Sequence, residues 1–310
     1  MSNIHDFRLV FMGTPSIASK VFEALIKEGY NFVGLIAQED KPVGRKGILM
    51  PVPTKEVALR YNIPVYQPHK IRSDFDFVKE LKPDLILTMA YGQIVPQGLL
   101  DIPRYGCLNL HGSLLPKYRG AAPIQRAIID GESVTGITLM EMVDKMDAGR
   151  MYAKEEVEIS LEDNYTSLCD KLSEAAIKVC LKNLPDYLDG KLCGEIQDES
   201  LVTIANKIKP EDEKLDLNKS TKDVINYVRG LSEEPGAYVL VDDKKLKIFK
   251  AHQVNVPLKK CGTLEVNKNT YLHLKDGTII LDMLQLEGKK KMDGKSFANG
   301  NKALDQMIAK

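Results

Sequence analysis

Short apolar runs alternate with amphipathic stretches along the first 112 residues of the chain. The apolar runs are RLVFMG (8–13), NFVGLIAQ (31–38), PVYQP (64–68), DLILTMAYG (84–92) and GCLNLHG (106–112). Between them, apolar side chains recur at helical spacing in residues 16–29, 54–62 and 74–83. Strands that alternate with helices predict a parallel sheet with helices on both faces. We therefore expect a Rossmann-like α/β domain over residues 1–188.

The pattern changes after residue 188. Residues 189–207 show no alternation of strands and helices, so we interpret them as a linker. Residues 236–254 and 262–288 then supply short strands separated by Asp-Asp, Asn-Lys-Asn and Asp-Gly turns. This pattern predicts a small antiparallel β-barrel domain of OB-like type over residues 208–310.

The composition is that of a globular protein and narrows the possible classes of protein and cellular locations. Of 310 residues, 44% are hydrophobic and 28% charged, which excludes a disordered chain. No apolar run approaches the ~20 residues that span a bilayer, and the polar start MSNIHDF is not typical of a targeting peptide. We expect a cytoplasmic protein.

Two further counts concern metals and partners. The five cysteines lack the spacing of a metal site, so we expect no metal. The net charge is zero, but residues 209–310 hold 19 Lys and Arg against 15 Asp and Glu. This mild positive excess favours a polyanionic partner only weakly.

The fifth apolar run carries two polar side chains where a buried strand needs none. Asn109 and His111 are two residues apart, so they project from the same face of a strand. They lie at its carboxyl end, where open α/β sheets hold their ligands. A buried polar pair that is satisfied by backbone groups is the alternative. Residues 11–18 (FMGTPSIA) lack the glycines of a dinucleotide loop, so they do not predict a nucleotide site.

A later acidic stretch, EMVDKMDAGRMY (141–152), offers a carboxylate to this pair. Asp147 precedes Ala-Gly, where a short turn can aim its side chain toward the pair. Asp144 is the alternative carboxylate, but it could simply cap or solvate this segment. Acyl transfer without a covalent protein intermediate can use three such groups: an amide to stabilise the oxyanion, an imidazole to move a proton and a carboxylate to orient the imidazole or to accept a proton. Ser113 could be a nucleophile instead, but its context is not the GxSxG elbow.

Residues 108–128 (LNLHGSLLPKYRGAAPIQRAI), together with 140–152 (MEMVDKMDAGRMY), resemble the core signature of the 10-formyltetrahydrofolate-dependent formyltransferases. The resemblance implies that Asn109, His111 and Asp147 form the catalytic set. It also implies that the loop Ser113-Leu114-Leu115-Pro116 lines the folate site, with 10-formyltetrahydrofolate as the co-substrate. The chain is thus expected to transfer a formyl group to an amine.

Two segments bear on which amine is formylated. Residues 37–55 (AQEDKPVGRKGILMPVPTK) resemble the loop with which some family members enter the acceptor stem of methionyl initiator tRNA, and Arg45 matches an important Arg there. Lys41 and Lys46 flank it as further tRNA-binding candidates, and the basic C-terminal domain resembles the domain that contacts tRNA in the same members. The resemblance thus implies an enzyme that supports translation initiation, and we expect it to be a monomer.

Two alternatives stay open. A formyltransferase that acts on a sugar amine or on glycinamide ribonucleotide would share the catalytic set without needing the 37–55 loop. A non-catalytic RNA-binding protein of the same domains would not need Asn109, His111 and Asp147 together.

Overall fold

The computed structural model describes residues 4–43 and 47–310. They form two compact units, each with a hydrophobic core of its own. The first unit consists of the residues up to 123, 134–158 and 169–205. The second consists of 124–133, 159–168 and 206–310. Two short segments, residues 124–133 and 159–168, therefore cluster with the C-terminal residues although they lie within the range 1–188 expected for the first domain.

The first unit is built on a seven-stranded sheet in the order β10-β9-β7-β6-β1-β2-β5. Five strands run parallel, and β9 and β10 add an antiparallel edge. The strands are β1 (Leu9–Gly13), β2 (Phe32–Ile36), β5 (Val65–Tyr66), β6 (Leu85–Met89), β7 (Cys107–His111), β9 (Val134–Glu141) and β10 (Met151–Glu158). This confirms the mostly parallel α/β fold predicted from the apolar runs.

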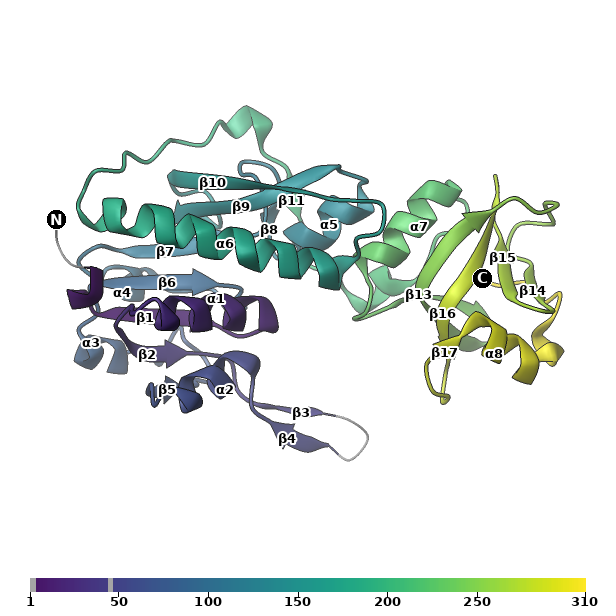
Figure 1. Ribbon diagram of the computed structural model, residues 1–310, viewed down its shortest axis with the longest axis horizontal. Coiled ribbons are helices and arrows are strands. Elements are labelled where there is room, and N and C mark those ends of the chain that lie inside the picture. The colour runs from purple at the N-terminus through teal and green to yellow at the C-terminus, as the bar shows by residue number, and fades with distance from the viewer. Residues whose placement is uncertain (1–3, 44–46) are drawn as a thin grey trace. The chain divides into compact units, whose positions relative to one another are not determined.

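Helices cover both faces of this sheet. They are α1 (Ser16–Lys27), α2 (Pro53–Arg60), α3 (Phe77–Leu81), α4 (Gln97–Leu100) and α6 (Tyr165–Leu188), with a 3-10 turn at Ile4–Asp6. A further helix, α5 (Pro123–Ile129), belongs to the second unit from Ile124 on. Figure 1 shows α1 and α6 lying along one face. There Phe11 of β1 stacks on Phe22 of α1, with ring centroids 4.7 Å apart. On the other face, α3 and α4 bury Val78 and Leu99 against the sheet.

Two short strand pairs lie outside the main sheet. β3 (Lys41–Val43) and β4 (Ile48–Met50) form an antiparallel hairpin within the 37–55 segment, where the sequence predicts a loop. β8 (Arg119–Gly120) pairs in parallel with β11 (Ile204–Ala205), close to a 3-10 turn at Glu199–Leu201. The second pair fastens part of the expected linker to the residues that follow β7.

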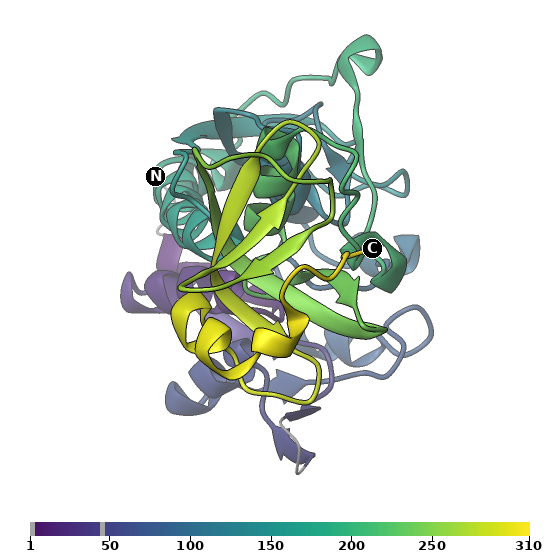
Figure 2. The ribbon, with the colours of Figure 1, turned by 90° about the vertical axis from the view of Figure 1, so that its right-hand side faces the viewer.

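The second unit is an antiparallel sheet in the order β12-β13-β16-β15-β14, with β17 beside β16. Figures 1 and 2 show this sheet curling. Its elements are α7 (Thr221–Gly230), β12 (Ala237–Val241), β13 (Lys244–Val254), β14 (Leu264–Val266), β15 (Thr270–His273), β16 (Thr278–Leu286), β17 (Met292–Asp293) and α8 (Gly294–Gly300), with 3-10 turns at Pro210–Glu213 and Lys302–Leu304. Asp242 and Asp243 form the β12–β13 turn with φ values of 52° and 56°, as a two-residue hairpin of type I′ requires.

The last residues of the chain connect the two edges of this sheet. At the β12 edge, Lys310 and Leu240 exchange backbone hydrogen bonds of 2.9 and 2.8 Å. At the β14 edge, the Leu264 N–H donates to Met307 O over 2.8 Å, and the Ala309 N–H donates to Gly262 O over 2.7 Å. The sheet thus curls toward a barrel, as the run of short strands and turns predicts.

The aromatic cluster of the first unit provides a test of its core. We expect Phe22→Ala to lower the free energy of unfolding of this unit by about 3–5 kcal/mol, because it leaves a cavity against Phe11 and Phe32. Urea unfolding followed by circular dichroism measures the change. Leu59→Ala is the control, because Leu59 is 58% exposed. Equal losses in the two variants would contradict the assignment of Phe22 to the core.

Candidate active site

Asn109 and His111 lie at the carboxyl end of β7, between β6 and β9. In the sheet register, Asn109 is opposite Thr88 of β6, and His111 is opposite Thr138 of β9. His111 is only 5% exposed, and Asn109 is half-buried. The structure therefore brings both side chains to the carboxyl end of an interior strand of the sheet.

The His111 ring is oriented by a main-chain carbonyl. Its Nε2 lies 2.8 Å from the carbonyl oxygen of Tyr118. A carbonyl oxygen only accepts hydrogen bonds, so Nε2 carries the proton and a neutral imidazole has its lone pair on Nδ1. Nδ1 lies 3.7 Å from Asp147 Oδ1, which is longer than a hydrogen bond. Nδ1 is consequently the nitrogen that can take up a proton while facing a carboxylate.

Asp147 reaches this position through a tight turn between β9 and β10. Its φ of 51° lies in the left-handed region, and its Oδ2 accepts the Gly120 N–H over 2.8 Å. The turn closes at Gly149, where a Cβ atom would collide with the carbonyl oxygen of Glu141. Asp144 is exposed and makes no hydrogen bond or ion pair to another described residue. The structure thus brings Asp147 rather than Asp144 to His111.

Several polar groups on the Asn109 side of the sheet lack partners. The Asn109 amide makes no hydrogen bond to any residue that the structure describes, and the buried hydroxyls of Thr88 and Tyr91 have none either. Burial raises the pKa of Tyr91 to about 12, so this hydroxyl stays protonated. Thr88 and Asn109 are register partners, so they project from the same face. Unpaired buried polar groups are rare in proteins, and here they indicate a place where a polar ligand binds.

The 113–116 loop after β7 is held by buried hydrogen bonds. The Ser113 hydroxyl donates to Lys117 O over 2.6 Å, and Thr138 Oγ1 donates to Ser113 O and accepts from the Leu115 N–H. Leu115 is buried, whereas Leu114 and Pro116 are half-buried. Because Ser113 is fully buried and donates to a carbonyl, the geometry gives no support to its alternative role as a nucleophile.

Two residues that the sequence reasoning missed hold the Asp147 turn. Arg119 is 3% exposed, and its Nε–H donates to Gln197 Oε1 over 2.9 Å. Gln197 is 5% exposed, and its Nε2 donates to the carbonyl oxygens of Asp147 and Gly149, each over 2.8 Å. Arg119 falls within the family-like motif, which could have drawn attention to it. Gln197 lies in a segment without periodicity, and no local signal marks it.

Of the three candidates for nucleic-acid binding, the structure describes one. Lys41 is exposed at the start of β3, where it pairs with Met50. Arg45 and Lys46 lie outside the described residues. The three residues of β4 expose apolar side chains, which is uncommon for a hairpin: Ile48, Leu49 and Met50.

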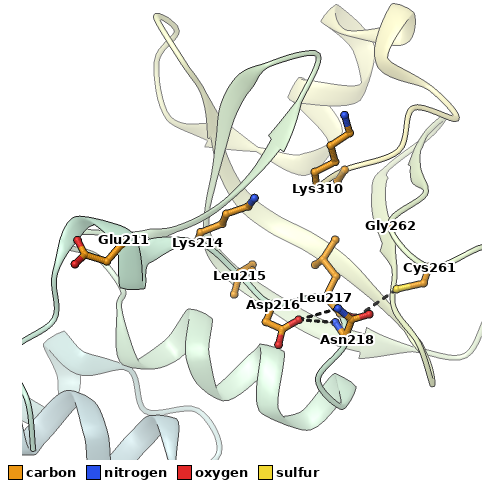
Figure 3. A pocket seen from close by; sticks show the side chains of 10 residues that line it. Glu211, Lys214, Leu215, Asp216, Leu217, Asn218, Cys261, Gly262 and Lys310 are labelled. Carbon is orange, nitrogen blue, oxygen red and sulfur yellow. Dashed lines mark hydrogen bonds between the residues drawn. The ribbon is translucent and has the colours of Figure 1, made fainter.

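Three further features of the described residues concern a hollow, metal ligands and membrane-spanning helices. A hollow of about 570 Å³ in the second unit is lined by side chains that include Lys214, Asp216 and Cys261, and none of the nominated site residues lines it (Figure 3). Within residues 4–43 and 47–310, no cluster of His, Cys, Asp and Glu could hold a metal ion. No helix in the same ranges is long and apolar enough to cross a membrane.

Comparison with known families matches almost the whole chain. The model of the formyl transferase family matches residues 7–184, and that of its C-terminal domain matches residues 207–302. The chain is 44% identical over 299 residues to a methionyl-tRNA formyltransferase of Bacillus subtilis, with 94% of each chain covered. It is 42% identical over 298 residues to a methionyl-tRNA formyltransferase of Listeria innocua, with 94% of this chain and 95% of the relative covered.

Solved structures share the fold at low sequence identity. HypX from Aquifex aeolicus in complex with tetrahydrofolic acid is 18% identical, with a TM-score of 0.70, and covers 97% of this chain and 48% of its own. WlaRD, a sugar 3N-formyl transferase, is 18% identical with a TM-score of 0.64 and covers 92% and 99%. At this identity the likeness concerns the fold alone.

Glu199 should make stability depend on acid pH. Hydrogen bonds from Arg119 and then Lys145 lower the pKa of Glu199 from 4.5 to about 2. Because the unfolded chain takes up this proton first, the stabilisation is complete above about pH 4.5 and is lost as the pH falls toward 2. Glu199→Gln should therefore melt below the wild type near about pH 7, and the gap should shrink on acidification.

Thermal unfolding at a series of pH values measures this gap. Glu156→Gln is the matched control, since Glu156 is exposed and forms no ion pair with a described residue. A gap that stayed constant from neutral to acid pH would show that the Glu199 carboxylate does not stabilise the fold through its charge.

Proposed function

The chain belongs to the formyl transferase family, and we propose that it transfers the formyl group of 10-formyltetrahydrofolate to the α-amine of methionyl initiator tRNA. The single observation that carries this proposal is the geometry at the end of β7. There His111 is oriented beside the Asp147 carboxylate, and Asn109 projects from the same strand with an amide that no described residue engages. The high identity to methionyl-tRNA formyltransferases over both domains supports tRNA as the acceptor.

In the proposed reaction, the neutral amine of the methionyl group attacks the formyl carbon directly. A C–N bond forms, and the formyl oxygen gains negative charge in a tetrahedral intermediate. His111 Nδ1 takes the proton that the attacking amine must lose, since Nε2 is bound to the Tyr118 carbonyl. The same proton then passes to N10 of the folate as the bond between N10 and carbon breaks, and the enzyme returns to its initial state.

Asn109 and Asp147 have complementary electrostatic roles in this mechanism. The Asn109 amide donates to the formyl oxygen as it becomes an oxyanion, and none of the residues that the structure describes occupies its N–H groups. Asp147 faces the imidazolium that forms when Nδ1 is protonated, and at 3.7 Å opposite charges attract in a site largely closed to water. No covalent intermediate with the protein is needed.

Folate and tRNA would be bound by different parts of the chain. We assign the 113–116 loop and the polar groups of Thr88 and Asn109 to the folate side, because they line the same end of the sheet. We assign Lys41 of β3, together with Arg45 and Lys46, which follow it in the sequence, and the C-terminal unit with its mild positive excess, to tRNA. Lysine and arginine contacts to phosphates would give strong but largely sequence-independent binding. We retain a cytoplasmic location and a monomeric state as parts of the proposal.

Formyl transfer from 10-formyltetrahydrofolate tests the function directly, with methionyl initiator tRNA and a free amino sugar as competing acceptors. Transfer to the tRNA alone is the expected result. Transfer to the amino sugar alone would keep the catalytic set and refute the acceptor. Absence of transfer to either, with tRNA still bound, would favour a non-catalytic RNA-binding protein.

Asn109→Ala should reduce kcat by about 10²–10³-fold, the usual cost of one lost oxyanion donor. The fold should be unaffected, because the Asn109 amide holds no other described residue in place. Steady-state kinetics with saturating folate and tRNA measure the loss, and Asn31→Ala, at an exposed position just before β2, is the matched control. An unchanged kcat would remove Asn109 from the mechanism.

Arg45→Ala should raise the KM for tRNA and leave the KM for the folate unchanged. If Arg45 neutralises one phosphate, the slope of log affinity against log salt concentration should fall by about 1. Filter binding at several salt concentrations measures this slope. Lys79→Ala, at an exposed position on α3, is the control. The same slope in Arg45→Ala and the wild type would exclude a phosphate contact.

A further inference from the structure

We propose that Gln197 and Arg119 are positioning residues that set the distance between Asp147 and His111. The inference rests on the proposed function, in which this distance governs proton transfer at Nδ1. It assigns a role in the chemistry to residues 195–205, which from their sequence are only expected to link two domains.

Gln197 fixes the main chain of the Asp147 turn on both sides of Ala148. A single carboxamide nitrogen has two hydrogens, and here they donate to the carbonyl oxygens of Asp147 and Gly149. The turn contains a non-glycine residue in the left-handed region, a conformation that is disfavoured without outside support. Gln197 supplies that support from outside the turn.

Arg119 determines which way the Gln197 amide points. The Nε–H of Arg119 is a donor only, so it takes the Gln197 oxygen and leaves the NH₂ group for the two carbonyls. The guanidinium is in turn held by Glu199, 2.8 Å from Nη2. An inverted amide would place a donor against Arg119 and an oxygen against two carbonyl oxygens. The Gln197 side-chain amide therefore has only one favourable orientation.

The same short segment holds both catalytic partners. The Tyr118 carbonyl accepts from His111 Nε2, and the Gly120 N–H donates to Asp147 Oδ2, so Tyr118, Arg119 and Gly120 lie between the two. This segment is itself fastened by Thr203, whose carbonyl accepts the Arg119 N–H and whose hydroxyl accepts the Tyr118 N–H. The 195–205 segment thus holds His111 and Asp147 through one continuous set of hydrogen bonds.

Close packing keeps this set in register. At Gly120, where φ is 124°, an added Cβ atom would lie 2.6 Å from the carbonyl oxygen of Ala205. Glu195 and Met151 exchange backbone hydrogen bonds of 2.8 Å, which ties the other end of the segment to β10 just after the turn. With both ends attached, Gln197 has little freedom to follow a displaced Asp147.

Two substitutions at Gln197 separate its donor from its acceptor. Gln197→Met preserves the length of the side chain and removes every hydrogen bond. Gln197→Glu keeps an oxygen for Arg119 but cannot donate to the two carbonyls. We expect both to lower kcat by about 10–100-fold, as a small misplacement of a catalytic group does, with the KM for the folate unchanged. Gln97→Met is the matched control, because Gln97 is exposed on α4 and belongs to neither the folate nor the tRNA assignment.

Amide hydrogen exchange provides a readout that does not depend on the reaction. If the turn loosens, the Gly120 N–H should exchange about 10–100-fold faster in both variants, since its acceptor is Asp147 Oδ2. The Gly136 amide in β9 should keep its rate. Arg119→Lys retains the charge that faces Glu199 but loses the Nε–H, and it should reproduce the fall in kcat if a Gln197 variant does not fold.

The outcomes distinguish this inference from the proposed function. Unchanged kcat and unchanged Gly120 exchange in both Gln197 variants would overturn the positioning role. A rise in the folate KM with kcat preserved would overturn it too, because it would assign Gln197 to ligand binding. If the wild type transfers no formyl group, the proposed function fails, whereas faster Gly120 exchange alone would still establish that Gln197 holds the Asp147 turn.

Discussion

The hydrogen bond between His111 Nε2 and the Tyr118 carbonyl is the contact on which the chemistry of this site depends. It decides the tautomer, because a carbonyl oxygen cannot donate, and it turns Nδ1 toward Asp147. Without this hydrogen bond, the ring could rotate or change tautomer, and it would not be fixed which nitrogen carries the proton and which one faces Asp147. The contact spans only seven residues, from the end of β7 to the loop after it, so strand and loop together orient the imidazole that we propose as the base.

Asp147 comes to His111 from elsewhere in the chain, and the sheet makes this possible. β9 lies antiparallel beside β7, so its last residue, Glu141, is opposite Leu108 near the start of β7. The loop of residues 142–150 that follows β9 must therefore run back along the sheet to bring the Asp147 carboxylate within 3.7 Å of the His111 ring. The glycine at 149 lets this loop pass against Glu141.

Local sequence patterns were sufficient for much of the fold and for part of the site. The five parallel strands follow from apolar runs, and the same-face placement of Asn109 and His111 follows from strand periodicity. The choice of Asp147 over Asp144 came from the Ala-Gly turn. The alternating polar pattern of β10 and the apolar run of β9 were not recognised as strands. Gln197 could not be found at all, because its partner Arg119 is 78 residues away and only the folded chain brings the two together.

The site combines groups that are firmly held with groups that have no partner. His111 and Asp147 are fixed by main-chain and side-chain hydrogen bonds, whereas the Asn109 amide and the Thr88 hydroxyl on the same face have no partner among the described residues. A buried polar group without a partner is destabilising, so a protein retains it where a ligand supplies the missing bond. The Asn109 and Thr88 side chains both come from central strands of the sheet, where the surrounding core limits their freedom to move. This division between held and unpaired groups is what acyl transfer without a covalent intermediate requires: a fixed base on one side and free donors for the developing oxyanion on the other.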